Sequence, residues 1–379
     1  MRSSSGQYFA KLDHVRAFAC YCVFIWHFLP RETPIEYSPA LFPFVLLKEG
    51  HVGVSFFMCL SGYLFAKILD GAEINYVAFL WNRFLRLAPL LVFVLAIVGT
   101  IDVAFNGWTA LGYAKLAITG LILPIWPNGG WSIAVETQFY LLLPALLFLA
   151  ARSPWLILSL VALTVSLRVG LHLTTGNVQL FAYQTILGRF DQFAFGILFF
   201  HVGKALADKH LLALLTAAGF LAFYYAFDSA GGNAAADKRL WIVIPTIEAF
   251  CISLLITYYD RTRFELPQAL SHFLANIGAA SYSIYLLHPF FVSKLSAFAA
   301  GLSFFPAVIL ATVVFVATLP ISLVTYNLIE KPIMSLRVKY TARPKRPFFV
   351  SKTHRLGWAD RRIGTGAPTA REETSKFGG

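Results

Sequence analysis

The chain has few charged residues. Asp, Glu, Lys and Arg make up 13% of its 379 residues, whereas a soluble domain carries about 25%. Hydrophobic residues make up 58% of the chain, and its mean hydropathy is +0.67. This composition excludes an ordinary soluble domain and indicates a polytopic membrane protein.

Cysteine is also scarce. The four cysteines, Cys20, Cys22, Cys59 and Cys251, all lie in apolar stretches and lack the spacing of a zinc site or a disulfide framework. We therefore predict no metal site, and we expect these cysteines to be small core residues. The first apolar run has no convincing small-residue cleavage site, so we interpret it as a first span and not as a signal peptide.

Acidic residues are fewer than basic ones, 19 against 31, which gives a net charge of +12. Much of this excess lies between Glu330 and the end of the chain, where twelve Lys or Arg residues accompany four Asp or Glu residues. We predict a helical membrane domain over 1–335 and a basic, disordered cytoplasmic tail over 336–379. Next to a membrane, such a tail indicates the cytoplasmic side and anionic lipid more simply than nucleic acid.

A helix needs about 20 mostly apolar residues to cross a bilayer. Ten stretches meet this need and predict an all-α membrane helical bundle: 12–30, 45–68, 85–105, 134–151, 154–173, 186–203, 211–228, 240–258, 273–293 and 303–328. A further run at 110–126 is broken by Pro124 and Pro127, so we expect it to be re-entrant or interfacial. Ten spans place both termini in the cytoplasm, whereas an eleventh span would place the basic tail outside, against the positive-inside rule.

Two polar side chains lie inside the first apolar stretch. Arg16 and His27 are separated by about 16 Å along a helix and lie on nearly the same face. A cation and an imidazole are costly in a membrane helix, so they indicate function. Asp13 lies one turn before Arg16 and is expected to pair with it. The alternative is a snorkelling arginine and a histidine at the outer interface.

Arg83 and Arg86 lie one turn apart at the cytoplasmic start of the third stretch. Arginine suits phosphate because its planar donors bind two oxygens at once, although the two residues could simply set the topology. Ser61 and Gly62 lie in mid-membrane, where a small pair lets another backbone or a ligand approach closely. Ordinary helix packing is the simpler explanation of that pair.

Glu136 lies near the outer mouth of the fourth stretch, shortly after Trp131. A capping box would pair Ser132 with an acid at the position of Val135, so capping does not explain Glu136. A carboxylate that dips into a membrane indicates general acid–base chemistry or binding of sugar hydroxyls. The alternative is an acid favoured by the helix dipole.

Later stretches carry two more polar groups. Arg189 and Asp191 could neutralise each other or pair across helices. Ser281, Tyr285 and His288 share the ninth stretch, where His288 lies near the outer end and could equally be interfacial.

In this order, the motifs resemble the membrane-bound acyltransferase-3 family, the integral-membrane O-acyltransferases of bacterial polysaccharides and related glycans. The resemblance covers nearly all of the chain to about Pro332. It rests on Leu12-Asp13…Arg16…His27, the Phe-rich stretch ending in Ser61-Gly62, Arg83 and Arg86 before Pro89, Trp131-Ser132…Val135-Glu136…Gln138-Phe139-Tyr140, Arg189-Phe190-Asp191, and Ser281-Tyr282-Ser283…Tyr285…His288-Pro289. The chain departs from the family pattern at His14, Met58 and Thr137. Since Thr137 replaces a usual second acid, Glu136 is expected to act alone.

The resemblance implies an enzyme of the bacterial cytoplasmic membrane. Its donor would be a cytoplasmic acyl-coenzyme A, expected to be acetyl-coenzyme A, used as a co-substrate and not held as a resident cofactor. Its acceptor would be a hydroxyl of a cell-surface polysaccharide or a lipid-linked glycan. His27 and Glu136 are the predicted catalytic residues, with His27 either the acyl acceptor or the base. Donor binding is assigned to Arg16, Ser61, Arg83 and Arg86. Substrate-binding or structural roles are assigned to Asp13, Trp131, Ser132, Arg189, Asp191, Ser281, Tyr285 and His288.

Three alternatives stay open. A transporter or flippase of lipid-linked sugars suits ten spans with buried charges, although no internal repeat or pair of broken helices is visible. A non-catalytic membrane scaffold would leave Arg16, His27 and Glu136 unexplained. An enzyme of this kind could also acylate a small molecule, such as an antibiotic or a lipid.

Overall fold

A computed structural model describes residues 9–29, 42–123, 125–235 and 238–342. The longer elements are α1 (Ala10–Phe28), α3 (Val52–Leu69), α4 (Tyr76–Phe105), α6 (Trp131–Arg152), α7 (Leu156–Thr175), α9 (Ile186–Val202), α10 (His210–Ser229), α12 (Ile244–Arg261), α13 (Gln268–Ala279), α14 (Ser281–Leu295) and α15 (Phe304–Thr325). Short helices lie between or after them: α2 (Val45–Lys48), α5 (Ala110–Thr119), α8 (Gln179–Gln184), α11 (Gly232–Ala235) and α16 (Lys331–Met334). Tighter 3₁₀ turns occupy Gly203–Leu206, Lys238–Ile242 and Ser296–Ala299, and a π-helical turn occupies Tyr326–Glu330.

The predicted all-α membrane class is confirmed. Six segments of the described chain are long and apolar enough to cross a membrane: α3, α4, α6, α7, α10 and Phe304–Met334, which runs from α15 through α16. Other predicted spans form shorter or more highly charged helices: α9 has only 17 residues, and α1 carries Lys11, Asp13 and Arg16. The number of ten spans therefore stays a prediction.

The predicted ninth span is wrong as a single helix. Residues 273–293 are divided at Ala280 between α13 and α14. Just before this break, Gly278 lies so close to α1 that an added Cβ would collide with the Asp13 carbonyl. Glycine thus lets α13 pack tightly on α1, a contact that hydropathy alone does not reveal.

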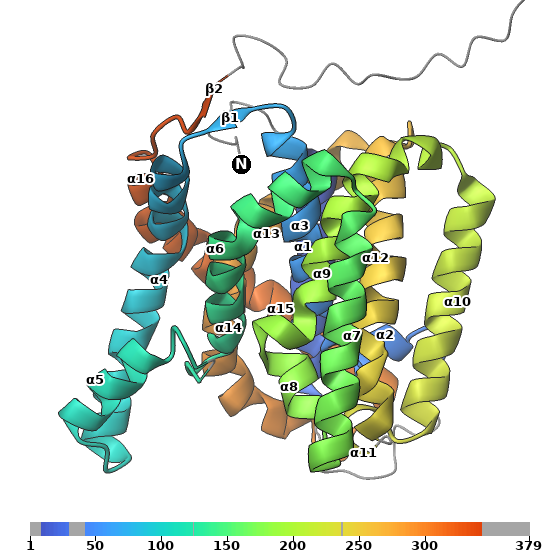
Figure 1. Cartoon of the computed structure of the whole chain (residues 1–379). Helices are drawn as coiled ribbons and strands as arrows, with labels where there is room; N and C mark the ends of the chain where they lie inside the picture. The colour runs from blue at the N-terminus through green and yellow to red at the C-terminus, as the bar shows by residue number, and fades with distance from the viewer. Residues whose placement is uncertain (1–8, 30–41, 124, 236–237, 343–379) are drawn as a thin grey trace, which may run out of the picture. The chain divides into compact units, whose positions relative to one another are not determined.

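The extra apolar run forms only the short helix α5. Its ten residues span about 15 Å, half of a bilayer core, so it is not an eleventh straight span. The Tyr113 hydroxyl donates a hydrogen bond of 2.9 Å to the Leu95 carbonyl of α4, and α5 lies beside the lower end of α4 (Figure 1). Pro124 lies outside the described residues.

Glycines join α3 and α9 at the centre of the bundle. A Cβ at Gly62 would collide with the Phe193 carbonyl, and a Cβ at Gly196 would collide with the Cys59 carbonyl. Close backbone approach through small residues is the usual packing of membrane helices. Here Gly62 admits a second backbone, as its position in the sequence allowed. All four cysteines are free, and Cys20, Cys22 and Cys59 are buried as expected, whereas Cys251 is half-buried.

The helical unit continues beyond the predicted boundary at residue 335. Strands β1 (Glu73–Ile74) and β2 (Thr341–Ala342) pair antiparallel, with Glu73 opposite Ala342 and Ile74 opposite Thr341. The Asn82 side chain holds the backbone of Val338 through bonds of 2.7 and 3.0 Å. These main-chain contacts leave no hydropathy signal, which is why the sequence alone places residues 336–342 in the tail.

The strands and α16 lie at one end of the bundle, and α2, α8 and α11 lie at the other (Figure 1). Arg2, Arg31 and the tail from residue 343 onward lie outside the described residues. The assignment of the strand end to the cytoplasm, with both termini there, stays a prediction.

A two-cavity candidate active site

A cavity of about 160 Å³, named the inner cavity after the cytoplasmic side that the sequence predicts for it, lies between α1, α3, α4, α6 and α14. The four residues predicted to bind the donor all line it: Arg16, Ser61, Arg83 and Arg86. Asp13, Ser132, Glu136, Ser281 and Tyr285 line it as well. Residues singled out in separate stretches of the sequence therefore meet in one place.

The arginines of this cavity differ in their partners. Arg16 forms the predicted ion pair with Asp13, at 2.5 Å. Arg86 pairs at 2.6 Å with the buried carboxylate of Glu330. Arg83 lies over the ring of Phe65, with 5.1 Å from the guanidinium carbon to the ring centroid.

Arg337 also lines the inner cavity, and sequence reasoning missed it. Burial, together with the nearby charges of Arg83 and Arg86, lowers the pKa of Arg337 to about 10. Among the described residues, the Nε atoms of Arg83 and Arg337 are buried without a hydrogen-bond partner. Crowded guanidinium groups with unused donors form a site that an anion would stabilise.

Glu136 lies on the inner side of the site. Ser61 donates a hydrogen bond of 3.2 Å to its carboxylate, and the Tyr140 hydroxyl donates another. Glu136 lines the inner cavity, whereas His27 lines a different one. Glu136 is therefore not placed to orient His27, because Ser61 and Tyr140 hold its carboxylate in the inner cavity.

The outer cavity has a volume of about 370 Å³ and includes His27. Aromatic and amide side chains supply much of its wall: Trp26, Trp131, Tyr183, Asn177, Gln179 and Asn233. No Asp, Glu, Lys or Arg is among the described residues that line it. His27 is thus the titratable group best placed to act on a ligand here.

Val54 and Tyr285 line both cavities and form a shared wall. The Tyr285 hydroxyl lies 2.7 Å from the Ser132 hydroxyl and donates a bond of 3.1 Å to the Gly129 carbonyl. Gly129 has a φ of +74°, a conformation that glycine adopts without strain. This turn brings the start of α6 against α14.

The Nδ1 atom of His27 lies 2.8 Å from the Val23 carbonyl. A carbonyl only accepts hydrogen bonds, so Nδ1 carries the proton and Nε2 holds the lone pair of the neutral ring. His288 is buried beside it, with ring centroids 4.8 Å apart. His288 therefore belongs to the site and not to the outer interface.

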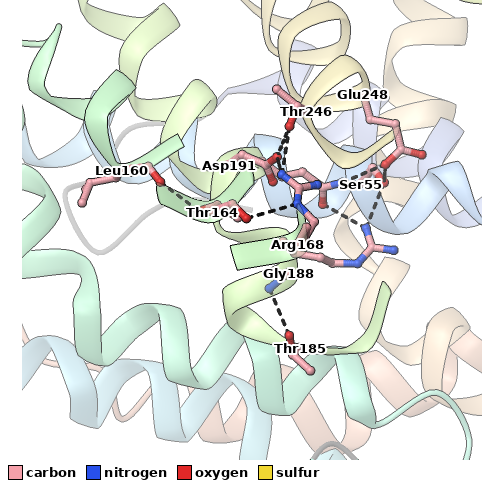
Figure 2. Close-up of polar contacts among 11 residues, drawn as sticks. Ser55, Leu160, Thr164, Arg168, Thr185, Gly188, Asp191, Thr246 and Glu248 are labelled. Atoms are coloured by element: carbon pink, nitrogen blue, oxygen red, sulfur yellow. Dashed lines mark hydrogen bonds and ion pairs between the residues drawn. The ribbon is translucent and has the colours of Figure 1, made fainter. Parts of the chain in front are cut away.

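Asp191 forms an ion pair across helices, one of the two arrangements that the sequence left open, whereas Arg189 is held by hydrogen bonds to Ser55 and Gln192. Asp191 forms an ion pair of 2.5 Å with Arg168 of α7, and both side chains are fully buried (Figure 2). The Thr246 hydroxyl of α12 donates a bond of 2.6 Å to the same carboxylate. This cluster joins α7, α9 and α12.

Glu248 gathers a second set of buried donors. Ser55 donates a bond of 2.7 Å to it (Figure 2), and Gln192 donates one of 2.8 Å. Arg189 in turn donates a bond of 3.0 Å to Ser55. The Arg189 guanidinium also stacks 4.4 Å from the ring centroid of Tyr183, a residue of the outer cavity. Through this stacking contact, the buried hydrogen bonds around Glu248 hold one wall of the outer cavity in place.

Sequence reasoning missed Arg168 and Glu248. Each is a charged residue inside a predicted span, the same signal that identified Arg16. Applying that rule to every stretch would have identified both.

The chain matches the family described as an acyltransferase domain over residues 9–327. It is 27% identical over 281 residues to a protein of Komagataeibacter xylinus assigned as the membrane-bound transacylase BcsY, which covers 64% of this chain and 66% of that protein. It is 25% identical over 331 residues to the O-acetyltransferase OatA of Staphylococcus aureus, covering 75% of this chain and 50% of that one.

A shorter match joins the chain to the peptidoglycan O-acetyltransferase OatA of Listeria monocytogenes, with 28% identity over 184 residues, 41% of this chain and 27% of the relative. The chain thus spans between about a quarter and two thirds of the length of these relatives. No solved structure matches it.

Proposed function

This chain belongs to the acyltransferase-3 family, and we propose that it is a multi-pass membrane O-acyltransferase. The proposed donor is a cytoplasmic acyl-coenzyme A, with acetyl as the expected acyl group. The proposed acceptor is a hydroxyl of a cell-surface polysaccharide or a lipid-linked sugar. The observation that carries the proposal is the pair of cavities that meet at Tyr285 and Val54, one lined by arginines and the other by His27.

The inner cavity suits the phosphates of the donor. Arg16 and Arg86 already have carboxylate partners, whereas Arg83 and Arg337 hold buried Nε donors without partners among the described residues. Guanidinium groups bind phosphate through paired, charge-assisted hydrogen bonds. We assign the phosphates to Arg83 and Arg337 first, with Arg16 deeper along α1.

The outer cavity suits a neutral sugar. Amide side chains can donate to and accept from hydroxyl groups, and the cavity presents several of them, with Gln179 held by a bond of 2.9 Å to the Asn233 side chain. Trp131 and Tyr183 lie with their ring centroids 5.0 Å apart and offer apolar faces for a sugar ring. This lining favours a carbohydrate acceptor over an anionic one. OatA of Listeria, named for peptidoglycan, is a relative that acts on such a polymer.

We propose that the Nε2 atom of His27 takes the proton of the acceptor hydroxyl. The hydroxyl oxygen then attacks the thioester carbonyl, the new C–O bond forms, and the C–S bond breaks. The thiolate of coenzyme A leaves on the inner side and takes up a proton. The alternative course is attack by Nε2 itself, which would form an acyl-imidazole before transfer to the hydroxyl.

Glu136 is assigned to the inner half of this reaction. It accepts hydrogen bonds from Ser61 and Tyr140 beside the arginines. A carboxylate there can supply or take up a proton as the thiol leaves. Its proposed effect is therefore on the donor side, and not on the orientation of His27.

The test uses purified protein in proteoliposomes with acetyl-labelled acetyl-coenzyme A and neutral oligosaccharides, chitopentaose and cellopentaose. We expect label to move covalently to an oligosaccharide as free coenzyme A appears. A transporter of lipid-linked sugars would leave acetyl-coenzyme A intact, and so would a scaffold. Label recovered in lipid or in an added small alcohol, and not in sugar, would support acylation of a small molecule.

A further inference from the structure

A proline in α14 changes what the neighbouring histidine can do. Pro289 lies inside this helix, where its missing N–H leaves the carbonyl four residues earlier without a helical donor. That carbonyl belongs to Tyr285. The Nδ1 atom of His288 lies 2.5 Å from it and takes the vacant place.

This bond fixes the tautomer of His288. Since the Tyr285 carbonyl only accepts, Nδ1 of His288 must carry the proton, and Nε2 must hold a lone pair in the neutral ring. Nε2 is buried and has no hydrogen-bond partner among the described residues. Buried polar atoms of native proteins are usually satisfied, so an exception points to function.

The ring of His288 packs on the ring of His27. Their centroids are 4.8 Å apart, with 60° between the ring planes. The Phe24 ring, 6.2 Å from His288, closes the apolar surroundings on the α1 side. His288 is 2% exposed, so its contact with the outer cavity passes through His27, which lines that cavity.

We propose that His288 is a positioning residue for His27, anchored to α14 by the carbonyl that Pro289 leaves free. The inference rests on the proposed function for the role of His27, but not for the geometry. Anchored in this way, His288 supports the His27 ring in the orientation in which Nδ1 is bound to Val23 and Nε2 carries the lone pair. Tyr285 connects this support to the wall between the two cavities, since its carbonyl holds His288 and its hydroxyl contacts Ser132.

His288 and Pro289 act together, because Pro289 leaves the Tyr285 carbonyl without a helical donor and His288 binds that carbonyl. Without Pro289, the backbone N–H of residue 289 would also bond to the Tyr285 carbonyl. The carbonyl would then be shared between two donors and would hold His288 less firmly. A purely structural proline in a helix interior has no such consequence, because replacing it with alanine restores a hydrogen bond and removes a steric clash. The two explanations therefore predict opposite results for the same substitution.

The decisive variant is Pro289→Ala, with Pro320→Ala as its control. Pro320 also lies inside a helix, α15, and is exposed. We expect Pro289→Ala to lower kcat for acetyl transfer about ten- to a hundredfold, with the donor KM unchanged and the melting temperature equal or higher. Pro320→Ala should leave kcat unchanged. His288→Ala should lower kcat in the same way, and Pro289→Ala still decides if that variant does not fold.

A second measurement needs no substrate. Nitrogen-15 NMR of histidine-labelled protein in lipid nanodiscs should show wild-type His288 with its proton on Nδ1, and Pro289→Ala should show this preference lost. Activity of Pro289→Ala equal to that of Pro320→Ala would overturn the proposal, as would a wild-type His288 protonated on Nε2. Absence of acetyl transfer by the wild-type protein would contradict the proposed function, while the tautomer measurement would still test this inference.

Discussion

The Tyr285 hydroxyl lies 2.7 Å from the Ser132 hydroxyl in the wall between the inner and outer cavities. Tyr285 comes from α14 and Ser132 from the first turn of α6, so the contact joins two helices that are far apart in the sequence. The acyl group must pass this wall if the donor is held on one side and the acceptor on the other. We therefore expect this contact to control whether the donor and the acceptor meet.

Tyr285→Phe should uncouple donor use from transfer. The substitution keeps the ring but removes the hydroxyl bonds that close the wall, so water from the outer cavity can reach the thioester. We expect the ratio of acetyl-coenzyme A hydrolysis to sugar acetylation to rise about tenfold, measured as free coenzyme A against acetylated oligosaccharide. The control is Tyr21→Phe, whose hydroxyl contacts Thr312 away from both cavities. An unchanged ratio in Tyr285→Phe would show that the hydroxyl does not close the wall.

His27→Ala should abolish acyl transfer while the protein still inserts and accumulates. The reason is that Nε2 of His27 is the proposed base or acyl acceptor, and alanine offers neither. Product formation and protein level in membranes are the two measurements. His27→Gln serves as the control for a purely structural hydrogen bond to Val23, and activity near the wild-type level in either variant would remove His27 from the reaction.

The gathering of these polar residues in one cavity could be predicted from the sequence to a large extent. Arg16, Ser61 and Arg83 meet in one cavity because charged or small residues inside apolar stretches have few stable positions except a shared polar interior. The two partners of Glu136 differ in this respect. Tyr140 lies one turn later on α6 and can be expected from helix spacing, whereas the contact with Ser61 depends on the packing of α3 against α6.

Arg83 and Arg337 should act on donor affinity. Each lines the inner cavity with a buried Nε that has no partner among the described residues. Hydrogen bonds to charged groups contribute about 1.5–3 kcal/mol, so alanine at either position should raise the donor KM about ten- to a hundredfold, with a smaller effect on kcat. Steady-state kinetics with varied acetyl-coenzyme A checks this, and an unchanged donor KM would leave only a role in topology.

Arg86 is expected to differ from these two arginines. Arg86→Ala would leave the buried carboxylate of Glu330 without its partner, which costs about 3–5 kcal/mol for a buried pair. Loss of folded protein should therefore accompany any loss of donor binding. Arg86→Ala with a wild-type melting temperature and a raised donor KM would contradict this distinction.

Asp191→Asn should destabilise the bundle without a specific effect on either substrate. It leaves Arg168 charged and fully buried opposite a neutral amide, and breaking such a pair costs about 3–5 kcal/mol. Thermal unfolding in detergent measures the loss. Asp208→Asn is the matched control, because the Asp208–Arg263 pair is exposed and 4.0 Å apart, and it should show no measurable change. A wild-type melting temperature for Asp191→Asn would show that the network is dispensable.

The buried pair of Arg168 and Asp191 could not be predicted from the sequence. A charged residue in a span predicts that a partner exists, but Arg168 and Asp191 lie on different helices, and hydropathy contains no information on which helices are neighbours. The assignment of residues 336–342 to the tail was wrong for a related reason. Their contacts to α4 and β1 run through main-chain atoms and Asn82, and such contacts leave no pattern in the side chains.

Cysteine labelling can test the sidedness of the whole arrangement. Asn106, at the end of α4, and Arg263, after α12, are both exposed, and the proposed topology places Asn106 outside and Arg263 inside. The background is low, because Cys20, Cys22 and Cys59 are buried and Cys251 can be replaced by serine. In intact cells, an impermeant maleimide should label Asn106→Cys but not Arg263→Cys, and permeabilisation should expose the latter. A third reporter, Ser351→Cys in the tail, should behave like Arg263→Cys, although it lies outside the described residues.

Labelling of Arg263→Cys but not of Asn106→Cys in intact cells would invert the topology. It would place the arginine cavity on the outer face, where cytoplasmic acyl-coenzyme A cannot reach it. Labelling of Asn106→Cys and Ser351→Cys together would instead favour an odd number of spans.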